Sequence, residues 1–67
     1  MDGDGMIRGE VYKKKSAWWF SKQRDGSTIV LSTKHRTQRS AIQEAENSLN
    51  EGYIDDLNIY NSKGELQ

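Results

Sequence analysis

Hydrophobic and polar residues alternate in four short segments of this 67-residue chain. The clearest is 16–23 (SAWWFSKQ), because Trp and Phe favour a pleated surface. Segment 28–33 (TIVLST) is β-branched, 55–60 alternates as well, and 6–12 alternates more weakly because it contains Gly9. A period of two places successive side chains on opposite faces of a strand. We therefore predict three or four strands, with 6–12 as a short strand at the edge of the sheet.

Asp25-Gly26 lies between the two strongest strand segments and is a strong hairpin signal. It predicts that these two strands pair antiparallel. In the first of them Trp18 and Phe20 share one face, and Trp19 points to the other. Only one face can carry the core, so at least one large aromatic side chain is expected on the opposite face. The pattern alone leaves open which Trp is buried.

One segment has helical spacing, from Gln38 to about Asn50. Thr37 is a favourable N-cap residue, and Gly52 can end the helix in a left-handed conformation. We predict a single α+β domain over 6–67, preceded by a flexible N-terminal end at 1–5. It has a small antiparallel sheet of three to four strands with one helix packed on one face, in the order (β)ββαβ. The predicted core is Trp18 or Trp19 with Phe20, Ile29, Leu31, Ala41, Ile42, Ala45, Leu49, Leu57 and Ile59.

Composition excludes several classes of protein. The chain has no cysteine and a single histidine, which argues against a disulfide scaffold, a thiolate metal site or a histidine zinc site. No apolar run approaches the roughly 20 residues of a transmembrane helix. We expect no metal, no cofactor and no membrane contact, and a cytoplasmic location.

Charge is strongly segregated although the formal net charge is zero. Between Tyr12 and Arg39 there are eight basic residues against one acidic residue, a local net charge of +7. The rest of the chain carries −7. Such asymmetry is a recognised sign of an electrostatic partner surface, although solvated strands rich in Lys and Arg would give the same pattern.

The order of motifs points to a family. Trp18-x-Phe20 is followed by a hairpin, then Thr37-x-x-x-Ala41-Ile42 at the helix start, Leu57-x-Ile59 and a turn ending in Gly64-x-Leu66. This order resembles a family of short bacterial and phage proteins of unknown function with a ββαβ fold. The resemblance covers residues 16–66 and implies the same fold.

The basic, aromatic-rich hairpin and the Thr-x-x-x-Ala helix start are also similar to the arm-type DNA-binding domains of phage integrases. In that family the exposed sheet face enters the major groove. The resemblance implies a DNA-contacting role for the matching positions, which are Lys22, Arg24, Thr28, Val30 and Lys34.

Nucleic-acid binding needs cations for phosphates and, for single strands, an exposed aromatic ring for stacking. Trp19 supplies the ring if Trp18 and Phe20 are buried. We predict a small non-enzymatic accessory protein of a bacterium or its phage that binds DNA or RNA. The predicted nucleic-acid-binding residues are Lys13, Lys14, Lys15, Trp19, Lys22, Arg24, Lys34, Arg36 and Arg39.

The alternative is a protein-interaction module that binds a host factor or forms a homodimer through the exposed sheet face or edge. Aromatic residues are favoured at the centres of protein interfaces, and the candidates are Tyr12, Trp19, Tyr53 and Tyr60. We do not expect an enzyme. The chain has no glycine-flanked nucleophile and no phosphate-binding glycine loop, and its only histidine, His35, lies between Lys34 and Arg36.

Overall fold

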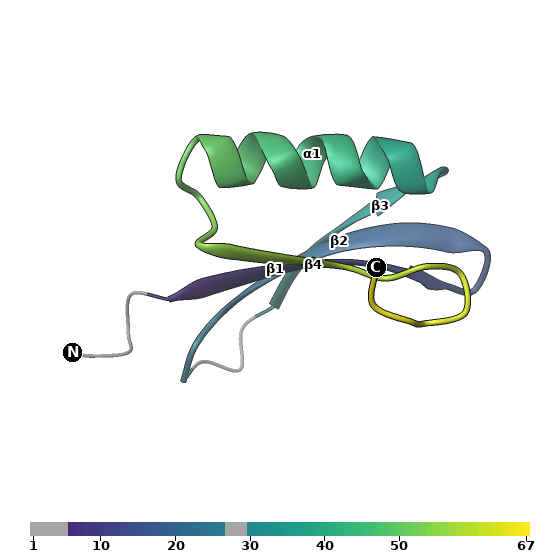
Figure 1. The fold of residues 1–67 in the computed structure, drawn as a ribbon, viewed down its shortest axis with the longest axis horizontal. Coiled ribbons are helices and arrows are strands. Elements are labelled where there is room, and N and C mark those ends of the chain that lie inside the picture. The colour runs from purple at the N-terminus through teal and green to yellow at the C-terminus, as the bar shows by residue number, and fades with distance from the viewer. Residues whose placement is uncertain (1–5, 27–29) are drawn as a thin grey trace.

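The computed structural model describes residues 6–26 and 30–67. Its elements are β1 (Ile7–Lys14), β2 (Ala17–Arg24), β3 (Val30–His35), α1 (Gln38–Asn50) and β4 (Asp56–Ile59). The strands form one sheet in the order β3-β2-β1-β4, and α1 lies across one of its faces (Figure 1). The predicted α+β class and the order (β)ββαβ are confirmed. The predicted flexible end at 1–5 lies outside the described residues.

The sequence had predicted a sheet that is antiparallel throughout. The observed sheet is mixed. β1 pairs antiparallel with β2 and β2 antiparallel with β3, but β4 pairs parallel with β1. Chain direction explains this difference. The single helix returns the chain to the end of the sheet from which β3 starts, so β4 runs in the same direction as β3, and β3 runs in the same direction as β1.

β1 is a central strand, so its prediction as an edge strand was wrong. It also extends to Lys14, two residues beyond the predicted segment 6–12. The turn is only Lys15 and Ser16, with φ angles of 53° and 70°. Positive φ at both positions is the signature of a type I′ hairpin turn, which usually requires Asn or Gly. Because Lys15 and Ser16 are not usual residues for this turn, the hairpin between β1 and β2 was not predicted from the sequence.

The core is small and lies between α1 and the two central strands. Its fully buried members are Val11, Phe20, Ala41, Ala45 and Ile54. Half-buried side chains pack around them: Ile7, Trp18, Ile42, Leu57 and Ile59. Trp18 therefore shares the helix-covered face with Phe20, which places Trp19 on the other face.

Two predicted core residues are exposed, and a third, Ile29, lies outside the described residues. Leu31 is 62% exposed because it lies on the edge strand β3, whereas α1 packs mainly over β1 and β2. Leu49 is 40% exposed because the last turn of α1 directs Ser48 toward the sheet instead. Ile54, which follows the helix and was not predicted as a core residue, is buried in the core.

The helix ends were predicted correctly from local signals. The Thr37 side chain accepts a hydrogen bond from Ser40 N at 3.1 Å, as an N-cap residue does. At the other end Gly52 has a φ of 83°, and Tyr53 N donates to Ser48 O at 2.8 Å. This arrangement satisfies carbonyl groups that the end of the helix leaves free.

Gly9 is the position where β1 has no side chain, and the core uses that space. A Cβ atom placed there would lie 2.6 Å from Ile54 Cδ1 and 2.9 Å from Phe20 Cε1. Both distances are shorter than van der Waals contact. The glycine that weakens the strand in the sequence pattern therefore permits the close approach of Phe20 and Ile54 to the sheet.

We predict that Gly9→Ala destabilises the protein by about 1–3 kcal/mol because it overpacks the core. The effect opposes the usual gain of about 0.5–1 kcal/mol for Ala over Gly in a strand. Urea unfolding measures the difference. Ile54→Val, which removes one end of the core isoleucine, is the companion variant, and the double variant should lose less stability than the sum of the two single changes. Strict additivity would contradict the proposed clash.

Candidate nucleic-acid interface

The sheet has one face that no described element covers (Figure 1). We call it the open face. Strand alternation assigns it the side chains that do not point at α1. Tyr12 on β1 lies opposite Trp19 on β2, which in turn lies opposite Lys34 on β3. These three side chains therefore form one row across the open face.

Hydroxyl groups hold the tyrosine of this row in place. Tyr12 Oη and Ser21 Oγ are 3.0 Å apart, and Ser21 Oγ and Ser32 Oγ are also 3.0 Å apart. Trp19 Nε1 donates to Lys14 O at 3.4 Å, close to the limit for a hydrogen bond. The rings of Tyr12 and Trp19 are therefore both held by hydrogen bonds to other groups of the sheet.

Two shallow hollows lie on the open face. The larger, of ≈ 340 Å³, is lined by Tyr12, Lys14, Lys15, Trp19 and Ser32. The smaller, of ≈ 260 Å³, is lined by Arg8, Glu10, Tyr12, Ser21, Gln23 and Val30. Only the larger one combines two aromatic rings with two cations. It is the part of the described structure that best fits a stacked base and its phosphates.

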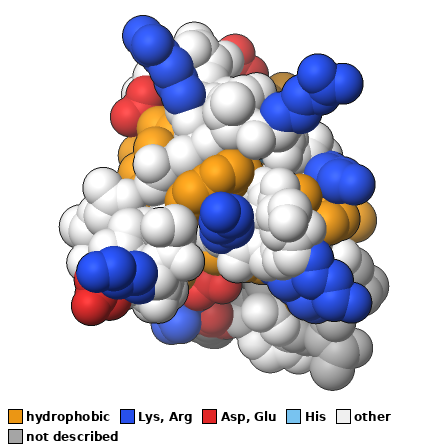
Figure 2. Space-filling view, turned by 90° about the vertical axis from the view of Figure 1, so that its right-hand side faces the viewer, with side chains coloured by type: hydrophobic (Ala, Val, Ile, Leu, Met, Phe, Trp, Pro, Cys, Tyr) orange, Lys and Arg blue, Asp and Glu red, His pale blue; other side chains and the backbone are white. Residues whose placement is uncertain are grey.

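The eight cations of the positive segment do not converge on this face. Lys14 and Lys34 lie on it, and Lys15 lies in the adjoining turn. The others lie on the helix side of the sheet or at the helix start: Lys13, Lys22, Arg24, Arg36 and Arg39. Figure 2 shows basic side chains spaced around the end of the molecule, with hydrophobic surface between them.

On the open face, acidic side chains limit the positive region to the end of the sheet near the Lys15-Ser16 turn. Glu10 and Asp56 belong to the open face farther along β1 and β4. Arg8 at that end is paired with Asp25, with 3.4 Å between Arg8 Nε and Asp25 Oδ1. The cations available to an anionic ligand on the open face are therefore Lys14, Lys15 and Lys34.

The aromatic residues of the alternative prediction lie in different parts of the chain. Tyr12 joins Trp19 on the open face, as described above. Tyr53 is 60% exposed in the segment after α1. Tyr60 follows β4, is half-buried, and donates its N–H to Val11 O at 2.8 Å. The row on the open face was not apparent in the sequence because the turn that sets its register, Lys15-Ser16, lacks the usual turn residues.

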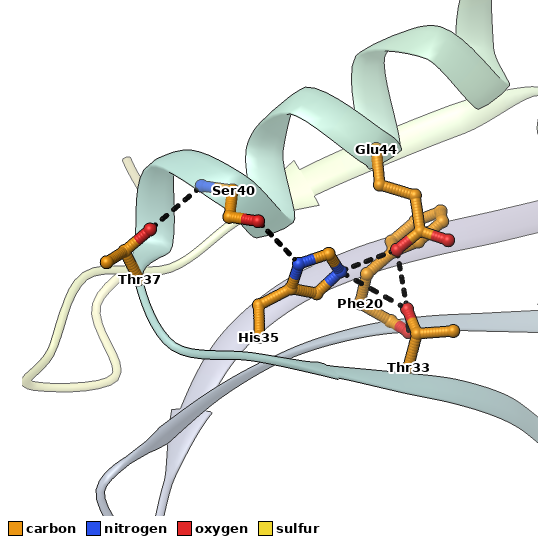
Figure 3. A network of polar contacts seen from close by, with 6 residues as sticks. All are labelled: Phe20, Thr33, His35, Thr37, Ser40 and Glu44. Carbon is orange, nitrogen blue, oxygen red and sulfur yellow. Dashed lines mark hydrogen bonds and ion pairs between the residues drawn. The ribbon is translucent and has the colours of Figure 1, made fainter.

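A second polar cluster lies on the helix side of the sheet and was missed by the sequence analysis (Figure 3). His35 Nε2 lies 2.6 Å from Glu44 Oε1, and His35 Nδ1 lies 2.8 Å from Ser40 Oγ. Thr33 Oγ1 donates to the same glutamate oxygen at 2.6 Å. The signal available in the sequence was the spacing of Ser40 and Glu44, which places both on one face of the helix.

This cluster connects β3 to α1. Partial burial acts to raise the pKa of Glu44, but hydrogen bonds from Thr33 and His35 and the charges of His35 and Lys22 outweigh it, so the pKa lies below its ordinary value. Serine, histidine and glutamate also form catalytic triads. Here Glu44 accepts bonds from both β3 side chains, and neither hollow described above is lined by these residues. The hydrogen bonds of this cluster join β3 to α1.

Two absences apply to the described part of the chain only. No helix among these residues is long and apolar enough to cross a bilayer. Within residues 6–26 and 30–67, no group of three acidic or histidine side chains is arranged to hold a metal ion.

We predict that Glu44→Gln destabilises the protein at neutral pH and that the difference from the wild type shrinks on acidification. A lowered folded pKa gives stability that is present above the ordinary value of 4.5 and is lost as the pH falls through the folded pKa. Urea unfolding from about pH 7 to about pH 3 measures this. Glu46→Gln, on the exposed side of the same helix, is the control. A difference between wild type and Glu44→Gln that is constant with pH would refute the prediction.

Comparisons with known proteins do not add to this picture. No protein-family model, curated protein or solved structure matches the chain. The resemblances to the ββαβ family and to the integrase arm domains therefore stay predictions. The candidate interface rests on the geometry of its own residues.

Proposed function

We propose that this protein is a small, non-enzymatic, cytoplasmic accessory protein of a bacterium or its phage that binds nucleic acid on its open face. The observation that carries the proposal is the row of Tyr12, Trp19 and Lys34, with Lys14 and Lys15 beside it. Stacking of bases on aromatic rings of a four-stranded sheet, with cations near the backbone, is an established mode of single-strand recognition.

The placement of the cations favours a single strand over a duplex. A duplex-reading hairpin would need Lys22 and Arg24 on the same face as Lys34, as the integrase resemblance implies. In this sheet Lys22 and Arg24 alternate to the helix side, opposite to Trp19. A flexible single strand needs only a base on the ring and phosphates near the three remaining cations.

The chemistry of the bound state follows from these groups. A base stacks on Trp19, and the neighbouring base lies near Tyr12, whose hydroxyl group is already held by Ser21. The ammonium groups of Lys14, Lys15 and Lys34 neutralise phosphates on either side. Stacking does not read base edges, so this mode of binding tolerates many sequences.

The runner-up function is a protein-interaction module. The observation in its favour is the edge strand β3, which exposes Val30 and Leu31. An exposed edge can receive an extended strand from another protein. This alternative does not require the row of aromatic and basic side chains on the open face.

We predict that Trp19→Ala weakens binding to an oligothymidine or oligouridine strand by roughly 5- to 150-fold, equivalent to about 1–3 kcal/mol for the loss of one stacked base. Fluorescence anisotropy at low ionic strength measures the affinity. Tyr53→Ala removes an exposed aromatic ring at a distant site and should leave the affinity unchanged. The proposed function fails if the wild-type protein binds neither strand at low salt, or if both variants bind equally well.

Salt dependence tests which cations touch phosphates. Three contacts to a single strand give a slope of about −2 for log K against log salt. Lys34→Ala should reduce the size of this slope by about 0.7. Arg24→Ala removes a charge from the same positive segment but from the helix side of the sheet, so it should leave the slope unchanged. An equal effect of both variants would mean that the whole segment acts as a diffuse positive field instead.

A further inference from the structure

The outer side of β3 is an unprotected sheet edge. No element of the described residues pairs with it, and its register with β2 runs without a bulge. The strand contains neither Pro nor Gly, and its one lysine lies near its end. By contrast, the C-terminal segment bonds to the opposite edge, where Gln67 N donates to Ile59 O at 2.8 Å. Proteins normally protect sheet edges with bulges, prolines, charged side chains or a covering segment, because exposed edges pair with other strands.

The hydrogen-bond pattern of β1 and β2 determines which groups of β3 point outward. Asp25 N donates to Met6 O at 2.9 Å, so these residues are a hydrogen-bonded pair of the antiparallel ladder. Hydrogen-bonded pairs recur at every second residue along such a ladder. By this count the N–H and C=O groups of Ser21 belong to the ladder with β1, and they point away from β3.

The consequence for β3 follows from its register. Ser32 lies opposite Ser21, so its own N–H and C=O groups point away from the sheet. The same alternation applies to Val30 and Lys34, two residues before and after it. The outer edge of β3 thus presents the backbone groups of three residues that are evenly spaced around Ser32.

This spacing is self-complementary. If two copies pair antiparallel with Ser32 opposite Ser32 of the second copy, Val30 of each copy lies opposite Lys34 of the other. Every outward N–H and C=O group of the three residues then faces a partner group. The two-fold axis runs perpendicular to the sheet, so both helices lie on one side and both open faces lie on the other.

Side chains and charge also favour a second copy. Leu31, 62% exposed, would lie opposite Thr33 of the second copy, and Val30, 48% exposed, opposite the aliphatic stem of Lys34. No like charges face each other in this register, because Lys34 of each copy lies opposite Val30 of the other. Because α1 packs mainly over β1 and β2, it leaves the edge accessible.

We infer that this protein forms a symmetric dimer through β3, with Ser32 on the two-fold axis and one continuous eight-stranded sheet. The inference does not depend on nucleic-acid binding. It explains why a leucine that the sequence pattern assigns to the core is exposed in the single chain. In the dimer the two open faces join into one surface that carries both copies of the Tyr12, Trp19 and Lys34 row.

Cysteine cross-linking tests the register, and the absence of native cysteines makes the readout clean. In the dimer the two Ser32 Cα atoms are about 5.5 Å apart, within the range that a disulfide spans. The two Val30 Cα atoms are about 14 Å apart, which is four residues along a strand. Ser32→Cys should therefore give a disulfide-linked dimer on mild oxidation, whereas Val30→Cys should form little disulfide-linked dimer. Equal cross-linking of both variants would overturn the register.

Sedimentation equilibrium of the unmodified protein without nucleic acid tests the dimer itself. The mass should rise from monomer to dimer with concentration. Leu31→Lys, which places a charge in the interface, should shift the protein to monomer. Leu49→Lys makes the same change at an exposed leucine of the helix and should leave the dimer intact, with circular dichroism confirming that both variants are folded. A wild-type protein that stays monomeric up to hundreds of micromolar would overturn the inference, whatever its affinity for oligonucleotides.

Discussion

Phe20 packs against β1 at the one point where that strand carries no side chain, and the small core is arranged around this contact. With Gly9 beneath it, the ring can lie close to the sheet beside Ile54. The helix then approaches with alanines, Ala41 and Ala45, rather than with large side chains. Because alanine is small, α1 lies close to β1 and β2, which it contacts more than it contacts β4 or β3. The position of the helix over the sheet follows from this contact.

The close approach of α1 to the central strands leaves β3 without apolar cover. Leu31 stays exposed, and polar side chains make the connection instead: His35 and Thr33 on β3 reach Glu44 on the helix (Figure 3). Such a connection is sensitive to acid because it depends on an ionised carboxylate. The edge strand is therefore held in place from the helix side, while its outer backbone groups stay available.

A single helix on a four-stranded sheet leaves one face and one edge for other molecules, and the two serve different proposals. The open face carries aromatic rings with cations, a combination suited to bases and phosphates. The β3 edge carries backbone groups in a self-complementary order, which suits a second copy of the chain. The proposals are compatible, since edge pairing extends the open face without covering it.

The amino-acid sequence by itself determined the local structure: the helix from Gln38 to Asn50, its cap at Thr37, its end at Gly52, and the opposite faces of Trp18 and Trp19. These features depend on side-chain periodicity and on contacts within a few residues. Only the tertiary structure decided the central position of β1, the parallel direction of β4, the pairing of His35 with Glu44, and which cations lie beside Trp19. Each of these joins segments that are distant in the chain. They follow from the competition of whole strands for one small core, which a local pattern does not encode.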